Sequence, residues 1–137
     1  MALSDHPAER HRQVAGLFTD RVHGTRSWDA PSPVAGWAAR DVVRHLTEWL
    51  SGFLASGAGI ELPADVFMHT WDLARATGQD DRLDPDFCAQ LLGQMEQMEQ
   101  VLRSSGQFGA RVEVPGGADT QTRLLGFIGR DPFWSGP

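Results

Sequence analysis

Hydrophobic residues recur every three or four positions along most of the chain, and this spacing predicts four main helices. We expect these helices at residues 7–23, 38–55, 64–77 and 84–104, separated by short segments that contain Gly and Pro. The second helix has the clearest apolar stripe, which consists of Val42, Val43, Leu46, Trp49, Leu50 and Phe53. The fourth has a good start signal, because Asp84 can cap a helix and Pro85 suits its first position.

The pattern changes after residue 104. Residues 110–114 alternate like a short strand, the Pro115-Gly-Gly sequence predicts a turn, and residues 119–128 fit a short helix. We therefore predict an all-α fold with a helical core over residues 7–104 and a short C-terminal segment, residues 105–137, that is irregular and contains some β structure. A chain of 137 residues suits one domain, residues 1–137.

Composition and charge argue against several classes of protein. A net charge of −6 and a pI near 5.2 argue against nucleic-acid binding, which needs a basic face. Apolar runs are too short to span a membrane, and the N-terminus lacks the apolar core of a signal peptide. The lone Cys88 permits no internal disulfide. We therefore expect a cytoplasmic protein.

All 12 basic residues are Arg, and Lys, Asn and Tyr are absent. Acid–base chemistry therefore falls to His, Asp, Glu or a bound metal, and the missing residue types indicate a GC-biased genome.

A candidate metal site begins with Asp65 and His69. Four residues of helix turn about 400°, so these two side chains lie about 40° apart on one face and could share a metal ion. A third ligand could come from His45, at the edge of the apolar stripe of the second helix. The spacing alone is weak, because chance also produces it: Asp41 precedes His45 by four residues, yet its place in a first helical turn favours a structural role. The alternative is that both histidines are partly buried and bonded to helix neighbours.

The order of several motifs is more specific than this spacing. Trp28-x-x-Pro-Ser-Pro-Val-x-Gly-Trp37 is followed by Arg-Asp-Val-Val-Arg-His45-Leu, by an acid-x-x-x-His-x-x-Asp helix over residues 65–72, and by a closing Leu124-Leu-Gly-Phe-Ile-Gly-Arg-Asp-Pro. Over nearly its whole length the chain resembles the DinB-like superfamily. The closest resemblance is to the branch with mycothiol-dependent maleylpyruvate isomerase and its actinobacterial metal-binding relatives, and a GC-biased genome agrees with that source.

The resemblance implies a helical bundle that holds one divalent metal through His45, Asp65 and His69, with mycothiol as a thiol cosubstrate. Zn is our first choice for the metal, and Ni and Fe(II) suit the same ligands. Two departures stand out. Relatives usually carry a long insertion, which includes another helix of the bundle, where this chain has only residues 56–63. The isomerase has Glu where this chain has Asp65.

Three further residues have candidate roles at this site. Asp72, one turn beyond His69, could orient a ligand histidine, or it could form a surface pair with Arg75. Arg123 and Arg130 could bind a carboxylate of the substrate or thiol, or they could form a C-terminal salt bridge.

Three functions remain open. The first is a metal-dependent thiol transferase or isomerase that acts on a small molecule. The second is a metal-binding protein without chemistry of its own, and the third is a metal-free interaction module that forms a homodimer through the face left by the missing helix. The two metal-binding functions require the short 56–63 link to bring His45 and His69 to within about 4 Å of each other.

Overall fold

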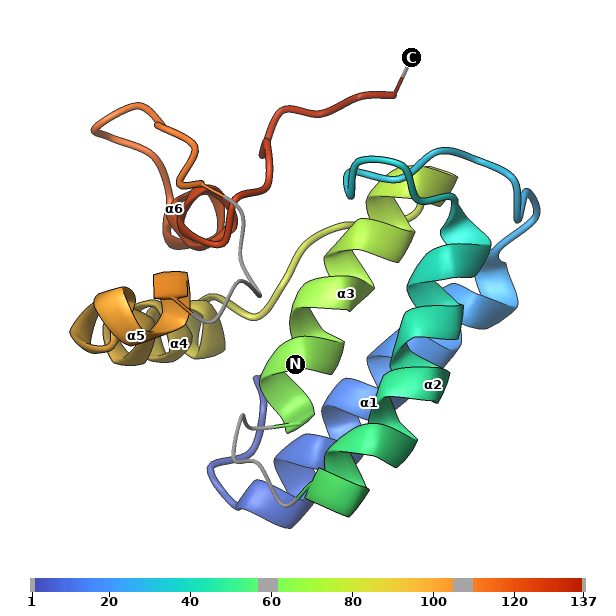
Figure 1. The fold of residues 1–137 in the computed structure, drawn as a ribbon, viewed down its shortest axis with the longest axis horizontal. Coiled ribbons are helices and arrows are strands. Elements are labelled where there is room, and N and C mark those ends of the chain that lie inside the picture. Colours follow the sequence, from blue (N-terminus) through green and yellow to red (C-terminus); the bar gives the residue numbers. More distant parts are fainter. Residues whose placement is uncertain (1, 57–61, 105–109, 137) are drawn as a thin grey trace. The chain divides into compact units, whose positions relative to one another are not determined.

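The computed structural model describes residues 2–56, 62–104 and 110–136, with the side chains of residues 49–56, 62 and 63 outside this description (Figure 1). These ranges contain six helices and no strand, which confirms the all-α prediction. The helices are α1 (Pro7–Gly24), α2 (Ala39–Ser56), α3 (Leu62–Thr77), α4 (Pro85–Gln97), α5 (Glu99–Ser104) and α6 (Thr120–Phe127). No helix within the described ranges has the length and apolar character needed to cross a membrane.

The first three helices follow the predicted boundaries closely. Each begins and ends within two residues of its predicted limits, and Gly78, with a φ of 69°, directly follows α3 in the left-handed conformation that commonly ends a helix. Most of the predicted 56–63 link lies outside the described residues. The spacing of apolar residues therefore predicted the bounds of these three helices well.

The fourth predicted helix is two helices. Asp84 caps α4 as expected, since its carboxylate accepts a hydrogen bond from the Phe87 N–H at 2.8 Å. The chain then leaves the helix at Met98 (φ −114°, ψ 20°). The prediction of one helix over 84–104 was therefore wrong. The apolar spacing of that helix would place Met98 and Val101 inside, but their side chains are 53% and 62% exposed. The buried face ends at Met95, so core packing does not hold the following turns in line with α4.

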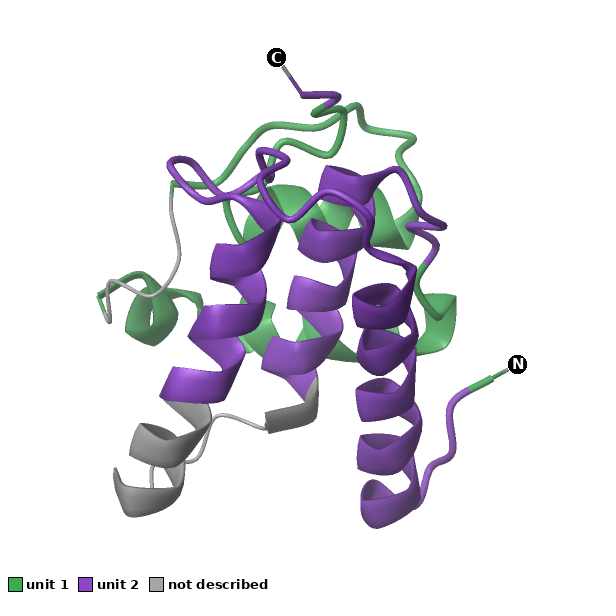
Figure 2. Ribbon diagram, turned by 90° about the vertical axis from the view of Figure 1, so that its right-hand side faces the viewer, with its two compact units in different colours: residues 1–2, 83–134 green, residues 3–82, 135–137 purple. Residues whose placement is uncertain are grey.

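The chain divides into two compact units, which Figure 2 shows in different colours. The first comprises residues 3–82 with 135–137, and in it α3 packs on both α1 and α2. Its core includes a cluster of Ala39, Val42 and Leu73, against which Trp28 and Trp37 pack among others. The second comprises residues 83–134 with 1–2 and contains α4, α5 and α6, with α6 packed on α4. The boundary between the units, at Leu83, lies before residue 104, where the sequence predicted that the helical core ends. The single domain over residues 1–137 stays a prediction.

Residues 110–114 form no strand, so the predicted β structure is not confirmed in the described part of the C-terminal segment. Instead, the Val112 N–H donates to the carbonyl of Gly126, within α6, at 2.9 Å. A Cβ at position 126 would lie 2.6 Å from the Val112 carbonyl oxygen, so this close approach requires glycine. The alternating pattern therefore packs against a helix rather than a second strand.

The loop between α1 and α2 is tied to the start of α2. Pro31 and Ala38 form an isolated antiparallel bridge, and the Ser32 N–H donates to the Trp37 carbonyl at 2.8 Å. Gly36 has a φ of 82° and permits the turn before Trp37. Asp41 reaches back to accept a hydrogen bond from the Ala38 N–H at 2.8 Å, which supports the start of a helix that lacks a Ser or Thr cap. Its structural interpretation is therefore confirmed.

Candidate metal centre

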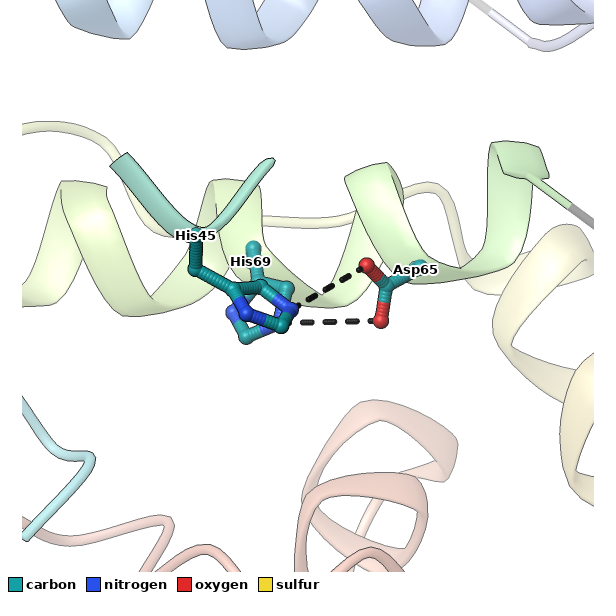
Figure 3. A group of neighbouring side chains, drawn as sticks. All are labelled: His45, Asp65 and His69. Carbon is teal, nitrogen blue, oxygen red and sulfur yellow. Dashed lines mark ion pairs between the residues drawn. The ribbon is translucent and has the colours of Figure 1, made fainter. Parts of the chain in front are cut away.

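Two helices of the first unit bring His45, Asp65 and His69 together. His45 lies on α2, while Asp65 and His69 lie one turn apart on α3, and all three side chains converge on one point (Figure 3). Each offers a ligating atom within 4.8 Å of the others. His45 Nε2 lies 3.8 Å from Asp65 Oδ2, and His69 Nε2 lies 3.6 Å from Asp65 Oδ1. The structure thus assembles the triad that the sequence predicted.

These distances suit a shared ion. Tetrahedral Zn with ligands at about 2.1 Å places neighbouring ligand atoms about 3.4 Å apart. The two histidine–aspartate distances of 3.8 and 3.6 Å exceed that value by a few tenths of an ångström, and they end on different oxygens of the carboxylate. With one ligating atom taken from each residue, the three atoms lie within 4.8 Å of one another. Binding of one ion would therefore require side-chain rotations that draw the three groups together.

The carboxylate of Asp65 contains a buried oxygen that lacks a hydrogen bond from the described residues. Oδ2 has almost no solvent contact and receives no hydrogen bond within the described part of the chain. A buried acceptor left in this state costs about 1–3 kcal/mol, and more when it is charged. A cation between Asp65 and the two imidazoles would satisfy it.

Asp72 contacts the other nitrogen of the His69 ring. Its Oδ2 is 2.8 Å from His69 Nδ1, and its side chain is completely buried. A carboxylate that accepts a hydrogen bond from Nδ1 leaves Nε2, which lies 3.6 Å from Asp65 Oδ1, available to bind a cation. Such a carboxylate–histidine pair is the usual support of a metal ligand.

The alternative role for Asp72, a surface pair with Arg75, does not fit this burial. Arg75 instead forms an ion pair with Asp81, with Nη1 2.6 Å from Oδ2. Asp72 is therefore an interior partner of His69.

Trp37 completes the surroundings of the triad, and sequence reasoning missed it. Its ring centroid lies 5.1 Å from that of His45 and 6.1 Å from that of His69, nearly parallel to the latter at 20°. Trp37 precedes α2 in a loop, so no helical spacing links it to either histidine. The only signal was its place in the motif that leads into the His45 helix.

The other candidate residues belong elsewhere. Arg123 is exposed on α6, and Arg130 is half-buried just beyond that helix, with its backbone N–H donating to the Leu125 carbonyl. Both lie in the second unit, whereas the triad lies in the first, so their role in substrate binding stays a prediction.

Cys88 is unsuited to nucleophilic chemistry. Burial, followed by the negative charges of Asp84 and Asp119, raises the pKa of its thiol from 9.0 to about 12. The reactive form of cysteine is the thiolate, which this environment disfavours. The chain's own thiol therefore offers neither a nucleophile nor a ready metal ligand at neutral pH.

Comparisons with protein-family models, with curated proteins and with solved structures found no match for this chain. The chemistry of the site must therefore be argued from its residues.

Proposed function

We propose that this chain binds one divalent metal ion through His45, Asp65 and His69. The observation that carries the proposal is the buried Oδ2 of Asp65, which receives no hydrogen bond from the described residues. The same carboxylate faces Nε2 of both histidines at 3.6 and 3.8 Å. Asp72 adds a second carboxylate to the site, on the far nitrogen of His69. A divalent cation would balance two carboxylates in this largely buried position, which supports the proposal beside the distances.

The ligand set favours Zn and also suits Ni and Fe(II). Two imidazole nitrogens and one carboxylate oxygen leave at least one coordination position open, which is the plan of a catalytic rather than a structural zinc site. The side chain of His45 is 29% exposed, against 8% for His69. A small molecule would therefore approach from the His45 side.

The finer proposal is a thiol transferase or isomerase. A divalent cation held at this site would supply the Lewis acidity that keeps a small thiol in its nucleophilic thiolate form near neutral pH. The protein's own residues would hold the ion, and Asp72 would keep the His69 lone pair directed at it. The resemblance in motif order makes mycothiol the thiol to test first.

Elemental analysis of protein purified without chelator tests the metal proposal. We expect about one equivalent of divalent metal in the wild-type protein and its loss in His69→Ala. The matched control is His23→Ala, because His23 is an exposed histidine of α1 in the same unit and lies outside the triad. A wild-type protein with no more metal than His69→Ala would refute the proposal, and a tight dimer in that state would favour the interaction module.

Cobalt substitution tests the thiol chemistry separately. If a thiol enters the open position, mycothiol will change the visible absorption of the Co(II) protein, and the same addition to His45→Ala will not reproduce that spectrum. If chelation lowers the melting temperature while thiols leave the Co(II) spectrum unchanged, the metal serves only to join α2 and α3.

A further inference from the structure

We propose that Trp37 is a positioning residue of this site, which holds the imidazole planes of His45 and His69 so that both Nε2 atoms face Asp65. This inference rests on the proposed function, since it concerns how the ligands of that metal are oriented. Trp37 touches neither the ion nor a substrate in this role, and it acts through the two rings.

The three rings contact one another. The Trp37 indole stacks on His69 at an interplanar angle of 20° and lies tilted at 44° against His45. The two imidazoles meet edge to face, with their centroids 4.8 Å apart and their planes at 60°. In Figure 3 both rings turn the same edge towards the carboxylate of Asp65. Rotation of either ring about its own side-chain bond would move Nε2 away from that point, and the indole surface opposes this rotation.

The two histidines come under different restraints. The Nδ1 of His69 is already fixed by Asp72 at 2.8 Å. Trp37 contacts both imidazoles, stacked on the face of His69 and tilted against His45. Because His45 is the more exposed ligand, its orientation gains most from a flat neighbour.

Trp37 is itself held on both sides of its peptide unit. Its N–H donates to the Val34 carbonyl at 3.0 Å, and its carbonyl accepts from the Ser32 N–H at 2.8 Å. The side chain also packs on the cluster of Ala39, Val42 and Leu73. A platform fixed to the start of α2 and to α3 can therefore set ring orientation before any metal binds.

The loop provides a matched control. Trp28 packs on the same hydrophobic cluster as Trp37, while the ring contacts to the histidines belong to Trp37. Trp28→Ala removes an indole from that cluster and leaves the imidazole contacts in place. Trp37→Phe keeps an aromatic face beside both rings, and Trp37→Ala removes it.

The experiment measures two properties of the full-length variants. The first is Zn affinity, from competition with a chromophoric chelator, together with the Co(II) spectrum. Loss of a group that orients metal ligands typically lowers affinity about 10- to 100-fold. We expect a fall of at least tenfold and an altered Co(II) spectrum for Trp37→Ala, substantial recovery in Trp37→Phe, and Zn affinity within about twofold of wild type in Trp28→Ala.

The second property is the NMR spectrum of the histidine rings in the metal-free protein. Loss of the indole ring current alone will shift the imidazole protons, so ring orientation is read from the NOEs between each imidazole and Asp65. Trp37→Ala should weaken these NOEs, and Trp28→Ala should leave them unchanged. Equal loss of Zn affinity in Trp37→Ala and Trp28→Ala would overturn the inference, since it would show only a structural role. Unchanged NOEs in Trp37→Ala would overturn it as well. A wild-type protein that binds no metal would refute the proposed function, and the NOEs of the metal-free protein would then still decide whether Trp37 orients the rings.

Discussion

The substitution Asp72→Asn tests how much the buried hydrogen bond between Asp72 and His69 contributes to metal binding. It preserves side-chain size and an acceptor oxygen for His69 Nδ1 but removes the negative charge from a residue that is fully buried. We therefore expect the fold to persist and the site to lose affinity. The change acts on the basicity and orientation of one ligand without altering any of the three ligating side chains.

The magnitude follows from the hydrogen bond at 2.8 Å. A bond to a charged acceptor contributes about 1.5–3 kcal/mol, against about 0.5–1.5 kcal/mol for a neutral pair, so the substitution loses about 1–1.5 kcal/mol. Since about 1.4 kcal/mol corresponds to a factor of ten, Zn affinity should fall about tenfold. The metal-free protein should lose less stability than the metal-loaded one, because removal of the Asp72 charge also relieves its repulsion of Asp65.

Competition titration with a chromophoric chelator measures the affinity, and urea unfolding with and without Zn measures the two stabilities. Asp81→Asn is the matched control, since it breaks the ion pair with Arg75 in the same unit at a position outside the triad. Partly exposed pairs of this kind contribute about 0–1 kcal/mol, and Zn affinity should not change. An Asp72→Asn affinity within twofold of wild type, or equal to that of Asp81→Asn, would refute the reasoning.

Three further outcomes are expected. Free Zn at 100 times its dissociation constant should raise the free energy of unfolding by about 2.7 kcal/mol in urea titrations, and Asp65→Asn should abolish this gain. Asp84→Ala should cost about 1 kcal/mol in the same assay, because it removes the cap on the Phe87 N–H, while Zn affinity stays unchanged. Folding raises the pKa of Cys88 from 9.0 to about 12, so its contribution to stability is complete below pH 9 and is lost as the pH rises towards 12. Unfolding curves across that range should show a decline that Cys88→Ala reduces.

Local patterns predicted the parts of the site that one helix determines. Asp65 and His69 share a face because of helical geometry alone, and the bond from His69 to Asp72 follows from the same period. The approach of His45 depends on how α2 packs against α3, which spacing cannot supply. The sequence offered His45 as a possible third ligand, the resemblance in motif order strengthened that interpretation, and the structure places His45 beside Asp65.

The failures share a physical cause. The helical period continued through Met98 and Val101, yet these side chains are exposed and the helix breaks, because burial rather than period decides where a helix persists. The alternation at 110–114 suggested a strand, but the chain pairs with α6 instead. The role of Trp37 is equally non-local, since a loop residue meets two helices only after they pack.

The most direct test of the metal centre is X-ray absorption spectroscopy of the Zn-loaded protein. Two imidazole nitrogens and one carboxylate oxygen are expected in the first shell, at about 2.0–2.2 Å, with a further light atom in the open position. His45→Ala should remove one imidazole and leave the other. A first shell without imidazole, or one that His45→Ala and His69→Ala leave unchanged, would contradict the assignment of His45, Asp65 and His69 as the ligands.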